Sequence, residues 1–206
     1  SLNDGQLTVS VVLIDLAGNE GDSVEATIEK DTAEPTLEEV NISSDNDNQS
    51  AAAVGDVITL DITVSEAITE PDVNIAGNKA AVTDADDNDA TTWQAEYTLT
   101  DGDTEGEVSF SINNYQDDFD NSGDEVTQTT DASSVEFSKT APSGYDISFD
   151  ADLDDINSSN EQNLSFEISG ADTGGNYRYT VTDKDGNEVS ATGDITSSPQ
   201  TVDGID

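Results

Sequence analysis

Apolar and polar residues alternate over several short stretches of the chain. The stretches Leu7–Leu13, Val57–Val64, Val108–Ile112 and Leu164–Ile168 place apolar residues at every second position. This period is typical of a strand with one buried face, and no stretch sustains the 3.6-residue period of an amphipathic helix. Asp, Asn, Gly and Ser separate these runs, as turn residues do. The pattern therefore predicts an all-β protein.

The apolar pattern belongs to an internal repeat. Residues 15–24 recur 102 positions later, and residues 35–47 recur 107 positions later. Matched pairs are Asp15 and Asp117, Asn19 and Asn121, Gly21 and Gly123, Pro35 and Pro142, Val40 and Ile147, and Ile42 and Phe149. A period of about 105 residues is a common domain length. We therefore expect a complete domain at 34–140, the front part of a second at 141–206, and the last strands of such a domain at 1–33.

Each repeat is expected to hold about seven strands, the number found in an Ig-like β-sandwich. In the complete domain they are expected at about 36–43, 56–65, 72–76, twice between 79 and 99, 107–115 and 125–138. In the divided domain they are expected at 145–150, 163–169, 176–182 and twice within 188–203, then at 6–14 and 23–30. Trp93 and Tyr97 are expected in the core. The predicted fold class is all-β, with tandem Ig-like β-sandwich domains.

The net charge of the chain limits the kinds of partner that it can bind. There are 47 Asp and Glu against 5 Lys and Arg, which gives a formal net charge of -42. Repulsion excludes nucleic acid and anionic membranes as partners and favours cations. A hydrophobic content of only 33% with this charge favours disorder unless something neutralises the carboxylates. Because the chain has no Cys, bound metal is the expected substitute for disulfides.

Catalysis and membrane insertion find little support in the sequence. The chain has no His, no Cys, no phosphate-binding loop and one Arg, so nucleophilic and phosphoryl-transfer chemistry lack their usual groups. Paired carboxylates hydrolyse glycosides in some enzymes, but any chain this acidic contains such pairs. No apolar stretch is long enough to span a membrane. We expect a protein that is not an enzyme and does not insert into membranes.

Several motifs resemble a known family. The turn Asp15–Gly21 and the linker Lys30–Leu37 resemble the D-x-A-G-N-x-G turn and D-T-x-P linker of Ig-like repeats in giant bacterial adhesins. These adhesins are type I-secreted proteins of the repeats-in-toxin kind. The segments Val64–Glu66, Trp93–Tyr97 and Ser138–Pro142 also resemble that family, so the resemblance covers essentially the whole chain. It implies an extracellular location on the bacterial cell surface and a role in cell adhesion and biofilm formation.

In that family, such domains form long extender regions. Calcium between the domains stiffens them into a rod that projects a terminal binding module from the cell. Two departures bear on the metal sites. Asp120 stands where the family's turn has Gly, and Thr140 stands where the other linker has Asp31. The resemblance therefore implies that the two junctions differ in metal affinity.

The acidic loops support calcium independently of the resemblance. Ca²⁺ takes six to eight oxygen ligands, and the chain offers no imidazole or thiolate that would compete. The Asp- and Asn-rich clusters lie at 45–48, 84–89, 101–103, 117–124 and 150–155. None of them matches the full loop of an EF-hand. The alternative is that these loops are merely solvated, as in proteins adapted to high salt.

An Ig-like topology would gather some of these groups at the domain junctions. At one junction, the loops around 45–47 and 101–103 should meet the turn near Asp172 and a turn of the Asp15 type. At the other, the loop at 152–155 should face Asp31, Glu66 or Glu70, and the turn at 117–121. The predicted metal ligands are Asp15, Asn19, Asp31, Asp45, Asp47, Glu66, Asp101, Asp103, Asp117, Asn121, Asp152, Asp154 and Asp172.

Two other functions remain open. A self-assembling fibre subunit would use residues 1–32 to complete the domain of a neighbour by strand exchange. We favour the alternative that this sequence is a segment of a longer tandem polypeptide over a separate fibre subunit. A carbohydrate- or surface-binding module would use Tyr115, Tyr177 or Tyr179 as a stacking platform. The expected partners are neighbouring Ig-like repeats, in the same polypeptide or in head-to-tail copies, and other domains would bind any carbohydrate or cell-surface ligand.

Overall fold

The part of the chain that the structure describes contains β-strands as its regular secondary structure. A computed structural model describes residues 1–85, 89–149 and 164–205. Within these residues there are strands, arranged in several small and mostly antiparallel sheets, and no helices. The prediction of an all-β protein is confirmed. No helix long and apolar enough to cross a membrane occurs among the described residues.

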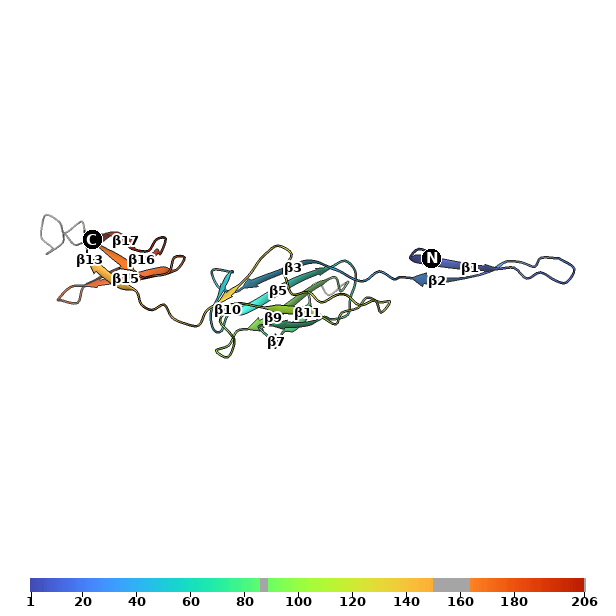
Figure 1. Ribbon diagram of the computed structural model, residues 1–206, viewed down its shortest axis with the longest axis horizontal. Coiled ribbons are helices and arrows are strands. Elements are labelled where there is room, and N and C mark those ends of the chain that lie inside the picture. The colour runs from blue at the N-terminus through green and yellow to red at the C-terminus, as the bar shows by residue number, and fades with distance from the viewer. Residues whose placement is uncertain (86–88, 150–163, 206) are drawn as a thin grey trace. The chain divides into compact units, whose positions relative to one another are not determined.

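The chain divides into two compact units, Ser1–Lys139 and Thr140–Asp206. The finer three-part division into 1–33, 34–140 and 141–206 stays a prediction. The strands of the first unit (Figure 1) are β1 (Gly5–Val11), β2 (Val24–Lys30), β3 (Leu37–Ser44), β4 (Ala51–Ala52), β5 (Val57–Val64), β6 (Asp72–Ile75), β7 (Asn78–Lys79), β8 (Ala81–Asp84), β9 (Thr92–Thr98), β10 (Gly106–Glu107), β11 (Phe110–Asn113) and β12 (Glu136–Phe137).

One hydrophobic core organises residues 37–137 of the first unit. The four-stranded sheet β3-β5-β9-β8 and the three-stranded sheet β11-β6-β7 both contribute side chains to it. Strand β5 shows why the alternation forms a strand, since Ile58, Leu60 and Ile62 are fully buried while Asp61 between them is exposed. Trp93 is buried in this core and Tyr97 packs against it, as predicted.

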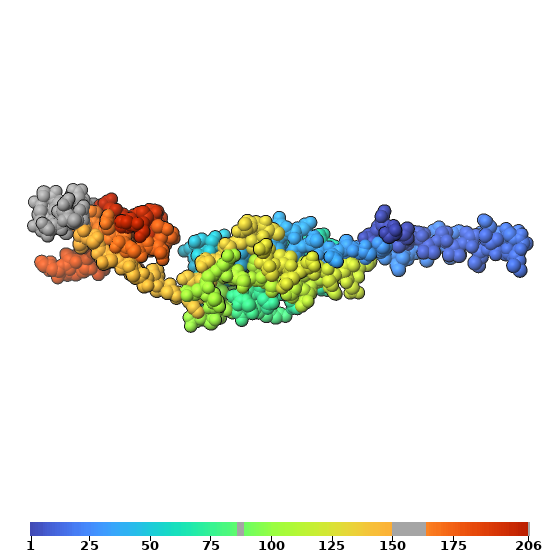
Figure 2. Space-filling model, in the orientation of Figure 1, coloured from blue at the N-terminus to red at the C-terminus, as the bar shows by residue number. Residues whose placement is uncertain are grey.

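Residues 5–30 of the first unit form a two-stranded hairpin. Strands β1 and β2 pair antiparallel from Gly5 opposite Lys30 to Val11 opposite Val24. Figure 2 shows these residues, in blue, as a narrow, elongated row of atoms. None of them belongs to a buried hydrophobic core.

The second unit repeats part of the first. Its strands are β13 (Asp146–Phe149), β14 (Leu164–Ser169), β15 (Asn176–Thr182), β16 (Glu188–Asp194) and β17 (Gln200–Ile205). The sheet β13-β14-β17 has the same antiparallel order as β3-β5-β9. Ile147 lies opposite Ile168, just as Val40 lies opposite Ile62. A small core formed by these strands includes Phe166, whose ring meets that of Tyr179 edge to face at 5.6 Å.

Two strand predictions were too long. The predicted strand at 107–115 divides into β10 and β11, and that at 125–138 contains only the short β12 and a bridge from Val126 to Ile112. Between Val126 and β12, side-chain oxygens accept hydrogen bonds from the backbone of β3. In a regular strand, backbone carbonyls would accept them. The Val40 N–H donates to Thr130 Oγ1 at 3.0 Å, and the Ile42 N–H donates to Ser133 Oγ at 3.0 Å. Ser and Thr commonly compete with ladders in this way.

Candidate metal site

Three carboxylates come together at one place in the first unit. Asp31, Glu66 and Asp117 each direct one oxygen into a group whose members lie within 4.8 Å of one another. Asp117 is only 4% exposed, whereas Asp31 and Glu66 are half-buried. All three are among the thirteen ligands predicted from the sequence.

Backbone hydrogen bonds hold the three segments together. The Ser65 N–H donates to the Thr36 carbonyl at 2.9 Å, and the Thr36 N–H donates to Ser65 Oγ at 3.0 Å. These bonds tie the linker that carries Asp31 to the end of β5, next to Glu66. The Thr69 N–H donates to the Gln116 carbonyl at 2.8 Å, which ties the same loop to the turn that carries Asp117.

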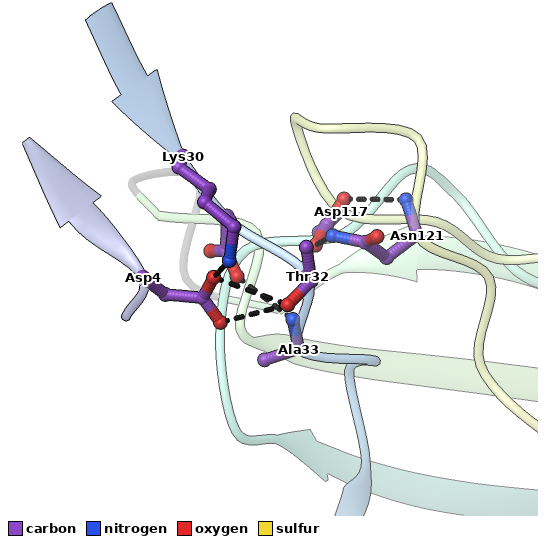
Figure 3. Close-up of polar contacts among 7 residues, drawn as sticks. Asp4, Lys30, Thr32, Ala33, Asp117 and Asn121 are labelled. Atoms are coloured by element: carbon purple, nitrogen blue, oxygen red, sulfur yellow. Dashed lines mark hydrogen bonds and ion pairs between the residues drawn. The ribbon is translucent and has the colours of Figure 1, made fainter. Parts of the chain in front are cut away.

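The Asp117 side chain is fixed by its own turn. Its Oδ1 accepts the Phe119 N–H at 2.8 Å. Asn121 donates twice to the same carboxylate, from its backbone N–H to Oδ1 at 2.9 Å and from Nδ2 to Oδ2 at 2.7 Å (Figure 3). Burial acts to raise the pKa of Asp117, but these hydrogen bonds outweigh it and hold the pKa below the ordinary value. Asp117 therefore supplies a fixed negative charge.

Glu66 is placed beside two like charges. Burial, and then the charges of Asp31 and Asp117, raise the pKa of Glu66 above its ordinary value. The separation of at most 4.8 Å is shorter than the Debye length of about 8 Å at physiological salt, so solvent ions do not screen this repulsion fully. A cation that binds all three groups would remove the repulsion.

The nearest lysine in sequence is engaged elsewhere. Lys30 Nζ donates to the Asp4 carboxylate, which also accepts Thr32 Oγ1 at 3.0 and 3.1 Å (Figure 3). The hydrogen bond from Lys30, followed by that from Thr32, lowers the pKa of Asp4. Among the described residues, no ion pair includes a carboxylate of the cluster. The negative charge of the cluster is therefore left for another cation.

The dimensions of the cluster suit a hard cation. Calcium binds carboxylate oxygens at about 2.4 Å, so two oxygens that share one ion lie up to about 4.8 Å apart. The three oxygens satisfy that limit. Three carboxylates would leave further coordination positions for backbone carbonyls or water, as hard cations require. The cluster of Asp31, Glu66 and Asp117 can thus hold a metal ion.

Other predicted ligands have different surroundings. Asp103 is buried, and it accepts hydrogen bonds from Thr100 N and Oγ1, Asn78 Nδ2 and Tyr97 Oη at 2.7–3.2 Å. Burial acts to raise the pKa of Asp103, but these bonds lower it below the ordinary value. The Asp103 carboxylate therefore closes the turn after β9.

Among the described residues, the other predicted Asp ligands are not members of the group formed by Asp31, Glu66 and Asp117. Asn121 lies beside Asp117 but uses its amide nitrogen to hold that carboxylate. Asp45 is exposed and accepts the Val57 N–H at 2.8 Å. The other exposed members of the set are Asp15, Asn19, Asp47, Asp101 and Asp172. Asp152 and Asp154 lie outside the described residues.

A third copy of the Asp117 turn was missed from the sequence. Asp183 Oδ1 accepts the Asn187 N–H at 2.9 Å and Oδ2 accepts Asn187 Nδ2 at 2.7 Å, as in the turns that begin at Asp15 and Asp117. The shared Asp-x-x-x-Asn spacing was the available signal. Asp120 takes φ 65°, the left-handed conformation that Gly18 takes in the first copy, so the substitution preserves the turn.

The three tyrosines predicted as a stacking platform are wholly or partly buried. Tyr115 is buried and its hydroxyl donates to the Asp124 carbonyl at 2.8 Å. Tyr177 and Tyr179 are half-buried and pack against the core of the second unit. The exposure that a stacking platform needs is therefore absent at Tyr115 and reduced at the other two.

Comparisons of the chain with family models, curated proteins and solved structures gave no match.

Proposed function

We propose that this chain is a structural extender segment of a bacterial surface adhesin, built from tandem Ig-like β-sandwich domains and stiffened by Ca²⁺. The single observation that carries the proposal is the cluster of Asp31, Glu66 and Asp117. One ligand comes from a linker and two from loops of the domain that follows it. A cation bound there would fix the direction in which the linker leaves the domain.

Calcium is the metal that the ligand chemistry favours. The cluster consists of carboxylate oxygens, and the chain contains no His or Cys to attract zinc or copper. Outside the cell, calcium is abundant enough to fill sites of micromolar to millimolar affinity. An extracellular location agrees with an acidic chain that has no cysteine to oxidise.

The arrangement of the first unit supports the Ig-like part of the proposal. Two sheets, β3-β5-β9-β8 and β11-β6-β7, direct side chains into one core, as the two layers of a sandwich do. The recurrence of β3-β5-β9 as β13-β14-β17 supports a tandem array. In such an array, each domain adds to the length of the rod, and the linkers between domains determine how stiff the rod is.

Chelation tests the proposal directly. We expect saturating Ca²⁺ to raise the melting temperature of the Ser1–Lys139 unit and to give a more extended, less variable X-ray scattering profile than excess chelator. By mass action, a ligand at 100 times its dissociation constant stabilises the folded state by about 2.7 kcal/mol. An unchanged melting temperature and profile on chelation would contradict the proposal.

A matched pair of variants localises the effect. Glu66→Gln removes one carboxylate of the cluster, whereas Glu70→Gln removes the same charge from an exposed position in the same loop. We expect the calcium-dependent shift to shrink by more than half in Glu66→Gln and to persist in Glu70→Gln. Equal shifts in both variants would place the stabilising ion elsewhere.

A further inference from the structure

The edge of β11 that faces away from β6 is only partly paired. The Ile112 N–H donates to the Val126 carbonyl at 2.9 Å and the Ile112 carbonyl accepts the Val126 N–H at 3.0 Å. Further along the same edge, the Val108 N–H donates to the Val135 carbonyl at 2.9 Å. The three residues between Val108 and Ile112 therefore face the eight residues between Val126 and Val135. A regular ladder would oppose three residues with three, so the two segments separate here.

Phe110 directs its backbone N–H and carbonyl into this gap. On the opposite edge, the Ala76 N–H donates to the Ser109 carbonyl at 2.8 Å, so Ser109 bonds toward β6. Bonding direction alternates along an antiparallel strand, and Phe110 therefore points the same way as Ile112. Val126 pairs with Ile112, but among the described residues no backbone group pairs with Phe110 on that edge. The gap leaves one main-chain donor and one main-chain acceptor for another strand.

The gap is a groove with a volume of about 670 Å³. Clefts that bind ligands usually have volumes of about 300–1,000 Å³. Its apolar part is formed by Ile42, Val108 and Phe110, which are all buried. Polar side chains line the rest, and among them Glu107 and Gln128 are exposed. The groove therefore offers an apolar floor and a polar rim beside an unpaired strand edge.

The far wall of the groove is held away from β11 by its own hydrogen bonds. The Thr130 N–H donates to the Val40 carbonyl at 2.9 Å, which fastens the wall to β3. Within the wall, Thr129 Oγ1 donates to the Ser133 carbonyl at 2.8 Å, and the Ser133 N–H donates to Asp131 Oδ1 at 2.9 Å. Pairing this segment with β11 would break these bonds. The gap is therefore available to a strand from another polypeptide.

The charge at the groove determines which strand fits. Glu107 lines the groove and lies directly opposite Glu136 in the pairing of β10 with β12. Both are exposed, and like charges in directly opposed positions destabilise a sheet. All five Lys and Arg of the chain are among the described residues, and none of them lines the groove. A Lys or Arg of the occupant would neutralise this repulsion.

From the unpaired edge, the groove and its charge, we propose that the first unit binds an extended, cationic segment of another polypeptide as an added β-strand. One residue of that segment exchanges two hydrogen bonds with Phe110 and directs an apolar side chain onto the floor of the groove. Because side chains alternate along a strand, the next residue lies on the face of Glu107 and Glu136, and it is a Lys or Arg. None of these groups belongs to the metal cluster, so this binding is separate from the proposed extender role.

Backbone amide NMR of the full chain tests the site with a defined probe, the acetylated and amidated peptide Thr-Val-Lys-Thr-Val. At low salt we expect saturable shifts and slower hydrogen exchange at the Phe110 amide. The Ile112 amide, which is already bonded to Val126, should change little. N-methylation of the valine before the lysine removes the donor to the Phe110 carbonyl and should weaken binding at least about 10-fold.

Two protein variants form a matched pair for the charge. Glu107 and Glu125 are both exposed, but only Glu107 lines the groove. Glu107→Gln should weaken binding of the probe about 2- to 5-fold, and Glu125→Gln should bind it as the wild type does. A retained pattern of amide shifts in each free variant checks that the fold is intact.

Three results would overturn the proposal: no shift at the Phe110 amide, equal affinity for the N-methylated peptide, or equal affinity of Glu107→Gln and Glu125→Gln for the probe. Shifts of the same amides with maltotriose and not with the peptide would assign the groove to a saccharide and would also overturn it. The titrations are run in excess chelator, so that their outcome does not depend on the calcium proposal.

Discussion

Residues 5–30 and residues 106–131 carry the same sequence pattern in different surroundings. Their turns are alike, because Asp15 Oδ1 accepts the Asn19 N–H at 2.8 Å and Asp117 Oδ1 accepts the Asn121 N–H at 2.9 Å. The bridge from Ile14 to Glu20 also recurs, between residues 116 and 122. Burial differs, since the first copy is exposed and the second contributes to a core. Local sequence therefore determines the turn, and the partner sheets determine the environment.

The same difference explains the candidate metal site. Asp15 and Asp117 hold equivalent places in equivalent turns, but only Asp117 lies beside Asp31 and Glu66. Asp31 comes from a linker and Glu66 from a loop, and among the described residues no comparable group of carboxylates includes Asp15. The turn holds the Asp117 carboxylate in place. The cluster forms because the linker carries Asp31 and the loop carries Glu66 to the same point.

The largest contrast is expected from truncating matched apolar residues. Ile112→Ala should lower the free energy of unfolding of the first unit by about 2–5 kcal/mol, because it leaves a cavity in the core. Val11→Ala, at concentrations where the chain is monomeric, should change it by less than about 0.5 kcal/mol. Denaturant unfolding followed by fluorescence of Trp93, the only tryptophan, measures both effects. Similar losses in the two variants would mean that the hairpin is already packed in the single chain.

Matched glycines sharpen the comparison further. A Cβ at Gly123 would lie 2.0 Å from Tyr115 Cε2, whereas one at Gly21 would meet only the Leu13 carbonyl oxygen at 3.5 Å. Because Tyr115 is buried, Gly123→Ala should cost about 1–3 kcal/mol through overpacking. Gly21→Ala should cost less than about 0.5 kcal/mol. The same unfolding experiment separates them, and a neutral Gly123→Ala would disprove the close packing of Tyr115.

A smaller effect is expected from pH in excess chelator. Because the folded-state pKa of Glu66 is raised, its contribution to stability is fully present below about pH 4.5 and is lost as pH rises through the raised pKa. Asp117 acts in the opposite direction, since its pKa is lowered and its contribution is lost as pH falls below 3.8. The Asp117 contribution largely cancels when wild type is compared with Glu66→Gln.

The stability of Glu66→Gln relative to wild type should therefore increase between pH 4 and pH 7 without metal. Denaturant midpoints measured across this range check the trend. Glu70→Gln, which changes the same charge outside the cluster, should not reproduce it. A relative stability of Glu66→Gln that is constant with pH would show that burial and the charges of Asp31 and Asp117 do not raise the pKa of Glu66.

Much of the strand pattern could be predicted because strict alternation coincides with burial. Strand β15 was predicted at residues 176–182, where it lies, and β5 was predicted within one residue at each end. The segment at 125–138 was mispredicted as one strand, because the side chains of Thr130 and Ser133 take over hydrogen bonds of β3. Turn chemistry of this kind depends on contacts across about 90 residues, which periodicity does not reveal.

The sequence predicted all three residues of the candidate site as metal ligands. It did not predict which of the thirteen predicted ligands lie together. Asp31, Glu66 and Asp117 were all named from the sequence, yet nothing there separated them from Asp103. The distinction is tertiary, because Asp103 is held by hydrogen bonds from Thr100, Asn78 and Tyr97. The cluster instead arises from backbone bonds that bring a linker, a loop and a turn together.

Calorimetric titration of Ca²⁺ into the wild type, Glu66→Gln and Glu70→Gln tests the central claim most directly. The account predicts that Glu66→Gln loses one binding event, or binds at that site at least about 10-fold more weakly, while Glu70→Gln binds as the wild type does. Identical stoichiometry and affinity in all three proteins would contradict the assignment of Asp31, Glu66 and Asp117 as a calcium site.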